Sequence, residues 1–223
     1  MISTVKLVAD PYPPYQFEKD GEVIGMDHDI IFEAFKVHGV EARTELLDWD
    51  ECVALLDAGK AEGIFQITPT PEREKQFRFS KPLRTAHTLF FKKKEDSISL
   101  NDGSSLGQRL GDLKIGVLAG YSYGDEVDRL KRSMKVEKTL SEELLRGLLR
   151  GEFSLALLDK GVAAFLVNKL VLEGVEPVRG FEIPRQLHVA FRKGLREHVQ
   201  LFNSGLSEIK KNGIYESVYR RYE

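Results

Sequence analysis

A single arginine stands where a helix is expected to begin. Thr70 is suited to cap that helix and Pro71 to occupy its first position, directly after an apolar strand expected over residues 63–67. The free N–H groups and the positive end of a helix at this point favour an anion, whereas a cation such as Arg73 is unfavourable there. Two explanations stay open: Arg73 binds a carboxylate ligand through both arms of its guanidinium group, or it pairs with an adjacent glutamate or a solvated neighbour. The segment by itself slightly favours the ion pair.

A carboxylate and a glycine-containing turn follow two later strands. Asp159 comes directly after the apolar run 155–158, and a carboxylate at a buried strand end is costly unless it is paired. It could bind the ammonium group of a ligand, or it could form a salt bridge with Lys160 or cap a helix. The turn that contains Tyr121 and Ser122 could donate N–H groups to an anion, with a plain strand–helix turn as the alternative. Because this turn has only two of the glycines of a phosphate loop, we do not expect a nucleotide site.

The remaining reactive side chains form no set with recognisable chemistry. The five histidines lack the spacing of metal ligands, and no serine lies in a G-x-S-x-G turn. No two carboxylates are paired by their spacing for acid–base catalysis. Cys52, the single cysteine, lies in a helical pattern and is interpreted as a small core residue. We therefore expect a protein without catalytic residues, bound metal or cofactor.

Composition narrows the class of protein. The 223 residues suffice for one large or two small domains, and 42% hydrophobic and 30% charged residues are ordinary for a soluble globular chain. The net charge of −2 argues against a nucleic-acid-binding surface, and no apolar run approaches the ~20 residues of a membrane helix. No signal peptide is recognisable, so we expect a protein that is either cytoplasmic or has had a signal removed.

Strands and helices alternate along the chain, which predicts an α/β fold with parallel βαβ units. Residues 11–17 are expected to form a fixed, extended loop, and residues 93–112 a loop or weak helix. Expected strands are 5–9, 40–47, 63–67, 84–92, 114–118, 136–138, 154–158 and 185–192. Expected helices include 50–58, 160–173 and 195–212, one that passes through Leu130, and a final amphipathic turn over 214–219.

The carboxyl ends of strands are where open sheets of this kind collect their ligands. In this chain those ends hold Asp10, Trp49, Thr68, Thr70, Gly120 to Ser122, and Asp159. Four aromatic residues could wall a small-molecule pocket nearby, although core packing is the commoner role for each one alone. They are Tyr12, Tyr15, Phe17 and Trp49.

Short motifs in a fixed order run through nearly the whole chain. They are Asp10 with Pro14-Tyr15-Gln16-Phe17, Gly21 with Ile24-Gly25-Met26-Asp27 and Asp29, Leu55…Gly59-Lys60, Thr70-Pro71-Glu72-Arg73, Phe79-Ser80-Lys81-Pro82, Lys114-Ile115-Gly116-Val117 with Gly120, Asp159, and Asn212-Gly213-Ile214-Tyr215…Tyr219. In order and spacing, the chain resembles the family 3 bacterial solute-binding proteins, the periplasmic amino-acid-binding proteins of ABC transporters. No single motif carries the resemblance; the order of all of them does.

The resemblance implies a two-lobed periplasmic-binding-protein (type II) fold with mixed, mostly parallel sheets. Two lobes joined by a hinge of two crossover strands would close on a ligand. Lobe 1 would comprise residues 1–90 and 188–223, and lobe 2 residues 91–187, with crossovers near 88–92 and 187–191.

The resemblance also implies how the α-carboxylate of an amino acid would be bound. Arg73 is the arginine of the family's T-x-x-R motif and would bind that carboxylate, with Thr68 and Thr70 nearby. Tyr121 and Ser122 in the second lobe would add donors to the same carboxylate.

Asp159 would bind the α-ammonium group, so that each end of the zwitterion meets its opposite charge. Asp10, Tyr15 and Trp49 would line the pocket for the ligand side chain. Gln66 stands where the family often has a small residue, which would alter that pocket.

The implied partners are a small-molecule ligand, an amino acid or related carboxylate, and an ABC transporter permease. We expect a periplasmic monomer whose signal peptide was removed and which binds no nucleic acid. Two departures from the family pattern are Glu62, where Asp is usual, and Leu83, where an aromatic residue is common. The alternatives are the sensor module of a signalling receptor and an enzyme like cyclohexadienyl dehydratase, which would need a general acid such as Glu18 or Asp159 with a raised pKa.

Overall fold

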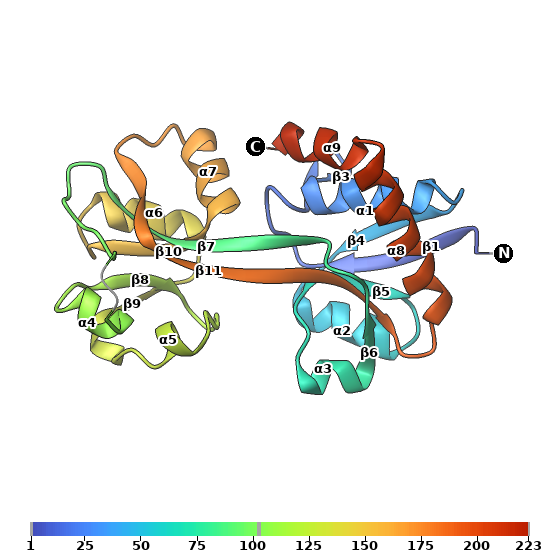
Figure 1. The fold of residues 1–223 in the computed structure, drawn as a ribbon, viewed down its shortest axis with the longest axis horizontal. Coiled ribbons are helices and arrows are strands. Elements are labelled where there is room, and N and C mark those ends of the chain that lie inside the picture. Colours follow the sequence, from blue (N-terminus) through green and yellow to red (C-terminus); the bar gives the residue numbers. More distant parts are fainter. Residues whose placement is uncertain (1, 102–103, 223) are drawn as a thin grey trace. The chain divides into compact units, whose positions relative to one another are not determined.

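The structure is a computed structural model that describes residues 2–101 and 104–222 (Figure 1). The chain forms two units: Met1–Thr85 with Arg185–Glu223, called unit 1, and Ala86–Pro184, called unit 2. It crosses between them in strands β7 (Arg84–Lys93) and β11 (Val175–Arg192).

The crossings fall after Thr85 and Pro184, whereas the predicted lobe boundaries fall after residues 90 and 187. The predicted lobes, as bodies that close on a ligand, stay a prediction. None of the helices in the described ranges is both long and apolar enough to cross a lipid bilayer.

Unit 1 is built on a mixed sheet. Its strand order is β4 (Glu41–Leu46), β1 (Thr4–Ala9), β5 (Gly63–Ile67) and β11, with β6 (Phe77–Phe79) also paired to β11. β1 runs parallel to β4 and β5, whereas β11 runs antiparallel to β5 and β6. Parallel neighbours need crossover connections, and α1 (Met26–Lys36) and α2 (Trp49–Asp57) provide them. A short hairpin of β2 (Phe17–Lys19) and β3 (Glu22–Ile24) precedes α1.

Helices cover both faces of the unit 1 sheet. In Figure 1, α1, α8 (Arg196–Lys211) and α9 (Ile214–Tyr222) lie on one face, and α2 and α3 (Pro71–Gln76) on the other. Strand β1 is accordingly apolar on both sides, with Leu7, Val8 and Ala9 all fully buried. Helices α1 and α8 approach so closely that a Cβ atom at Gly205 would lie 1.8 Å from the carbonyl oxygen of Ala34. Only glycine permits this contact.

Unit 2 repeats the same layering on a smaller scale. Its sheet follows the order β7, β10 (Leu155–Asp159), β8 (Ile115–Leu118) and β9 (Lys135–Lys138). β8 is parallel to β9 and β10, and β10 is antiparallel to β7. The helices are α4 (Leu106–Leu110), α5 (Asp125–Asp128), α6 (Ser141–Leu149) and α7 (Lys160–Lys169), with a 3-10 turn at Arg132–Met134. Each face of this sheet carries a buried apolar cluster. One cluster involves α4 and α5, and the other involves α6 and α7.

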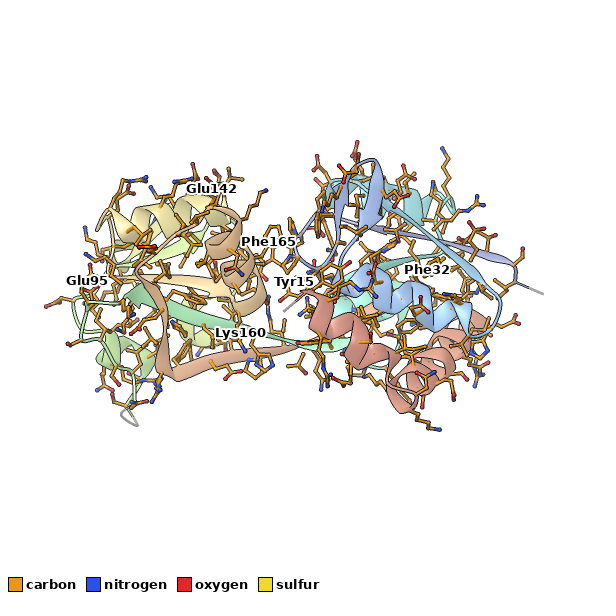
Figure 2. The ribbon with its side chains drawn as sticks, turned by 90° about the horizontal axis from the view of Figure 1, so that it is seen from above. Tyr15, Phe32, Glu95, Glu142, Lys160 and Phe165 are labelled. Atoms are coloured by element: carbon orange, nitrogen blue, oxygen red, sulfur yellow. The ribbon has the colours of Figure 1, made fainter. Side chains whose placement is uncertain are left out.

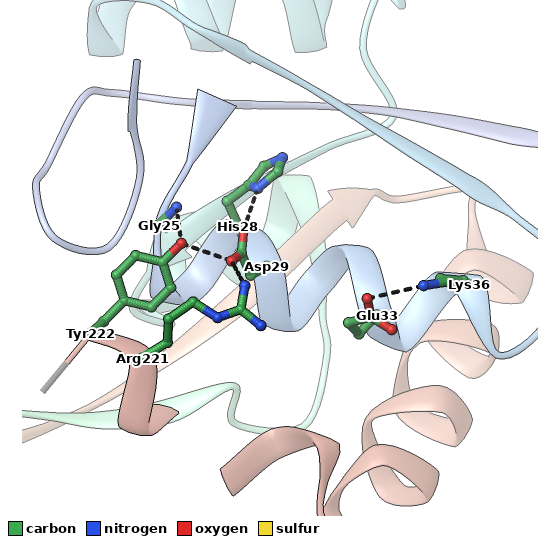
Figure 3. A network of polar contacts seen from close by, with 7 residues as sticks. All are labelled: Gly25, His28, Asp29, Glu33, Lys36, Arg221 and Tyr222. Carbon is green, nitrogen blue, oxygen red and sulfur yellow. Dashed lines mark hydrogen bonds and ion pairs between the residues drawn. The ribbon is translucent and has the colours of Figure 1, made fainter. Parts of the chain in front are cut away.

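The C-terminal helix is fastened to α1 by polar contacts (Figure 3). The Tyr222 hydroxyl donates to Asp29 Oδ2 at 2.7 Å and accepts the Gly25 N–H at 3.1 Å. Arg221 Nη1 also donates to Asp29 Oδ2, at 3.0 Å, and His28 Nδ1 lies 3.0 Å from Asp29 Oδ1. The predicted final turn over 214–219 is therefore a helix that continues to Tyr222.

Two predictions about local structure were wrong. Residues 11–17 do not form an extended loop: Tyr15 N–H donates to Tyr12 O at 2.9 Å, and Tyr12 N–H donates to Gln16 O at 2.7 Å, so the segment turns back on itself. Proline suits a turn as well as an extended chain, because it fixes only its own φ angle. The helix through Leu130 is a single turn, α5, which ends at Asp128.

The other two differences concern element ends. β11 begins at Val175 rather than 185, and it passes through Pro177 and Pro184. In that stretch the described strands give β11 only β7 as a neighbour in the sheet order. Proline is tolerated there, because an N–H group that points away from β7 would have no strand to donate to. α7 ends at Lys169 rather than 173, because the exposed Val171 adopts a φ of 51°, which no helix contains.

Candidate functional site

The predicted residues of unit 1 gather at one edge of its sheet. Because β4, β1 and β5 are parallel, their carboxyl ends lie at the same edge. Asp10 follows β1, Trp49 opens α2 shortly after β4, and Gln66 and Thr68 lie at the end of β5. These segments position the candidate side chains in the way that the strand–helix alternation predicts.

Arg73 is held by neutral groups. The Thr70 hydroxyl accepts the Arg73 N–H at 3.2 Å and caps α3, and Pro71 takes the first helical position. Arg73 Nη1 donates to Thr68 O at 3.0 Å and to Thr68 Oγ1 at 3.4 Å. Its guanidinium carbon lies 5.2 Å from the centre of the Trp49 ring.

Arg73 forms no ion pair with any residue in the described ranges. The adjacent Glu72 and Glu74 are exposed, and desolvation by burial is what lowers the pKa of the half-buried Arg73. The ion-pair explanation for this residue is therefore not the one that the structure favours. A desolvated guanidinium without a carboxylate partner is suited to an anion from outside the chain.

A second group links Asp10 to Gln66 through Gln16. Gln16 is fully buried, and its Nε2 donates to the Asp10 carbonyl at 3.0 Å and to Gln66 Oε1 at 2.7 Å. Gln66 adopts a φ of 57°, a left-handed conformation that is uncommon for a residue other than glycine. Burial raises the pKa of the Asp10 carboxyl, and the nearby charge of Asp48 raises it further, against a backbone hydrogen bond that lowers it.

Tyr15, which is labelled in Figure 2, is a buried aromatic residue of the same proline-rich turn as Gln16. Its ring is 5% exposed, stacks on Tyr12 at 5.9 Å, and covers the Arg84 guanidinium at 3.5 Å. Arg84 in turn pairs with Asp27 at 2.6 Å, both side chains being buried. The Tyr15 carbonyl accepts the Asp27 N–H at 2.9 Å, which fastens the proline-rich turn to the start of α1. Tyr12, which is half-buried, is the more accessible aromatic of the pair.

Cys52 lies in α2 near the same edge and is fully buried. Burial raises the pKa of its thiol to about 11, with the Asp10 carboxylate adding to the shift, and its Sγ donates to Leu47 O at 3.6 Å. The thiol is thus protonated at neutral pH, in line with its interpretation as a core residue.

In unit 2, Ser122 belongs to a turn that Asp128 organises. The Ser122 hydroxyl donates to Asp128 Oδ2 at 2.6 Å, and the N–H groups of Tyr123 and Gly124 donate to the same carboxylate at 3.0 and 3.2 Å. Desolvation raises the pKa of Asp128, but these hydrogen bonds and the charge of Lys135 outweigh it and lower the pKa overall. Tyr121 is exposed, and its ring lies 4.8 Å from that of Tyr123.

Asp159 is buried at the end of β10. Its Oδ1 accepts the N–H groups of Gly161 at 2.9 Å and Val162 at 3.1 Å, so it caps α7. The helix-cap role that the sequence left open is thus present. β8 and β10 are parallel neighbours, so Asp159 and the turn after Leu118 lie at the same edge of the unit 2 sheet.

Two residues near the candidate site were not among the predicted ones: Gln16 and Asp128. A polar Gln16 inside an aromatic and proline-rich segment was the available signal for the first. Tyr12 was named as a possible pocket wall, and nothing in the sequence singled out Asp128. Within the described residues, no group of three or more His, Cys, Asp or Glu side chains is arranged to hold a metal ion.

The sequence of this chain matches a family model over residues 5–223. The chain belongs to the bacterial extracellular solute-binding proteins, family 3. One relative is a probable histidine-binding protein from Campylobacter jejuni, 27% identical over 99% of this chain and 85% of its own length. The predicted resemblance is thereby confirmed.

Two solved structures extend the comparison. An ancestral arginine-binding protein bound to arginine is 26% identical with a TM-score of 0.76, covering 100% of this chain and 99% of its own. An ancestral amino acid-binding protein, described as a precursor of cyclohexadienyl dehydratase, is also 26% identical, with a TM-score of 0.75 over 99% of this chain and 95% of its own. The predicted periplasmic-binding-protein fold is confirmed by these likenesses.

Proposed function

We propose that this solute-binding protein captures an amino acid and that Arg73 binds its α-carboxylate. The observation that carries the proposal is the state of Arg73: a partly desolvated guanidinium, held by Thr68 and flanked by Trp49, with no carboxylate partner in the described chain. Two parallel N–H donors of a guanidinium match the two oxygens of a carboxylate, which makes this class of ligand the natural complement.

Asp159 is assigned to the α-ammonium group of the same ligand. It is the one carboxylate among the predicted site residues of unit 2, and it lies at the carboxyl end of β10, where its Oδ1 accepts the first N–H groups of α7. Tyr121 and Ser122, at the same sheet edge, are assigned as further donors to the ligand carboxylate. The Ser122 hydroxyl would have to leave Asp128 to take this role, whereas a backbone N–H would not.

The pocket for the ligand side chain is assigned to Asp10, Gln66, Tyr15 and Trp49, with Tyr12 as an additional wall. The carboxylate of Asp10 favours a side chain that donates hydrogen bonds or carries a positive charge. Relatives named for histidine and arginine binding support the same class of ligand. We therefore infer a preference for cationic or donor-rich amino acids over acidic ones.

The proposal has four further parts: delivery to an ABC permease, a periplasmic or extracellular location, a monomeric state and the absence of catalysis. The family and its relatives, which are named as binding proteins, support a non-catalytic role. The ancestral precursor of cyclohexadienyl dehydratase gives the enzyme alternative a specific test, namely turnover of prephenate-like acids.

The deciding experiment is a thermal-shift screen of the purified protein against the common amino acids, with mass spectrometry of any co-purified ligand. We expect a cationic or donor-rich amino acid to raise Tm, because a ligand that binds only the folded state stabilises it. No shift with any amino acid would overturn the proposal. Conversion of a prephenate-like acid would replace it with the enzyme alternative.

A further inference from the structure

Among the described residues of unit 1, Gln16 is the amide side chain that is both fully buried and bonded to two predicted site residues. Its Nε2 joins the backbone of Asp10, at the end of β1, to the side chain of Gln66, at the end of β5. These residues lie in separate segments, since Gln16 and Gln66 are 50 positions apart in the chain. One side chain therefore sets the spacing between two walls of the proposed pocket.

The pair is not arranged for maximum stability. Gln16 Oε1 and Gln66 Nε2 are buried, and neither has a hydrogen-bond partner within the described residues. A buried polar atom without a partner costs free energy, so two apolar side chains of similar volume would serve the core better. A costly polar contact of this kind is expected where geometry matters more than stability.

The backbone of Gln66 supports the same conclusion. Its φ of 57° is strained for a side-chain-bearing residue, and such strain persists only where surrounding contacts over-determine it. Among the described residues, the bond from Gln16 is the side-chain hydrogen bond that Gln66 receives. Removing it frees the side chain to adopt other rotamers.

We propose that Gln16 is a positioning residue that sets the ligand selectivity of this protein by holding Asp10 and Gln66 in register. The proposal rests on the proposed function, because it concerns the side-chain pocket of the same site. Gln16 acts through its two neighbours. It determines which amino-acid side chain fits the pocket, whereas Arg73 binds the α-carboxylate.

The test compares the wild-type chain with Gln16→Met, which has nearly the same volume and no donor. Calorimetry measures Kd for the preferred amino acid and for the smallest amino acid that binds. We expect the ratio of the two Kd values to change at least tenfold, with Kd for the smallest ligand staying within about twofold. A uniform loss for both ligands, or an unchanged ratio, would overturn the proposal.

Gln66→Met removes the same bond from its other end and keeps the proposal testable if Gln16→Met folds poorly. Each single variant should change the ratio, and the double variant should change it by less than the two single effects combined, because both single variants remove one shared contact. Gln76→Met, at the exposed end of α3, is the matched control and should leave the ratio unchanged. Additive effects of the two single variants would contradict the inference.

The proposed function is tested separately, by ligand binding to the wild-type chain. If that chain binds no amino acid, the inference falls with the function on which it rests. If it binds one and the Gln16 variants keep its selectivity, only the inference fails.

Discussion

The groups that position Arg73 for an anionic ligand carry no charge. Thr68 and Thr70 accept its N–H groups without neutralising its charge, and Trp49 offers a ring face rather than a carboxylate. An arginine held by an acid would have to give up that partner before binding a ligand. Here the charge is positioned while the positive potential is retained.

Replacing Arg73 should therefore abolish ligand binding without unfolding the chain. We expect Arg73→Ala to weaken the binding of the preferred amino acid by at least about 100-fold, since losing one member of a buried, hydrogen-bonded charge pair costs about 2–5 kcal/mol. Arg73→Lys keeps the charge but loses the paired donors, so an intermediate loss of about tenfold is expected. Calorimetric titration measures both values.

The control for this experiment is Arg43→Ala. Arg43 is exposed and, within the described part of the chain, its ion pair is with Glu41, so its removal should leave Kd unchanged. Arg84 is unsuitable, because it is paired with Asp27 in the core and its loss would destabilise the fold by about 3–5 kcal/mol. Equal losses for Arg73→Ala and Arg43→Ala would refute the assignment.

At the scale of elements, the contact between α1 and α9 depends on one carboxylate. Asp29 lies in the first turn of α1, where a negative charge suits the helix dipole. Its carboxylate accepts hydrogen bonds from Tyr222 and Arg221 and lies within hydrogen-bond distance of His28 Nδ1. Burial by itself raises the pKa of Asp29, but the bonds from His28 and Tyr222 and the nearby positive charges outweigh it and lower the pKa overall. The ionised form is thus the one that the folded state favours.

Asp29→Asn should destabilise the folded chain at neutral pH by roughly 1–2 kcal/mol, because the hydrogen bonds to a charged acceptor are weakened. The sign of the pH dependence follows from the lowered pKa. The contribution is fully present above the unfolded-state pKa of about 3.9, and it is lost as the pH falls through the lower folded-state pKa. Urea denaturation from pH 7 downwards should show the wild type and the variant converging in acid.

Asp57→Asn, at an exposed position of α2, is the companion variant and should change the unfolding free energy by less than about 0.5 kcal/mol at any pH. A difference between Asp29→Asn and the wild type that persists unchanged into acid would contradict the role given to the Asp29 charge.

Local chemistry was the part of the structure that the sequence could predict. Thr70 and Pro71 mark the start of α3 through groups that act within a few residues, and apolar runs mark β1, β5 and β10. The gathering of Asp10, Thr68 and Arg73 at one sheet edge follows from the alternation of strands and helices, because parallel strands end together.

Contacts between distant segments were not predictable in the same way. The bond from Gln16 to Gln66 and the pair of Arg84 with Asp27 join positions 50 and 57 residues apart, and no spacing rule connects them. The early start of β11 at Val175 was not predicted either, because a sequence does not reveal whether a strand that contains prolines has one neighbour or two at a given point.

At the scale of the whole molecule, the proposal assigns one ligand to residues of both units, so ligand-dependent stabilisation should require both. At a concentration 100 times Kd, a ligand stabilises the wild-type chain by about 2.7 kcal/mol, which corresponds to a rise in Tm of about 5–10 °C. Arg73→Ala in unit 1 and Asp159→Asn in unit 2 should each remove most of that rise.

Asp159→Asn is the informative member of this pair. Asparagine caps helices about as well as aspartate, so the variant keeps the start of α7 and loses only the negative charge. Its Tm without ligand should therefore stay close to that of the wild type, and Asp112→Asn, at an exposed position of unit 2, should retain the full rise with ligand. If Asp159→Asn also retains it, Asp159 is a helix cap and no more, and the ammonium group of the ligand must be sought elsewhere. If only Arg73→Ala abolishes the rise in Tm with ligand, the assignment of Arg73 to the ligand carboxylate stands and the assignment of Asp159 to the ammonium group is wrong.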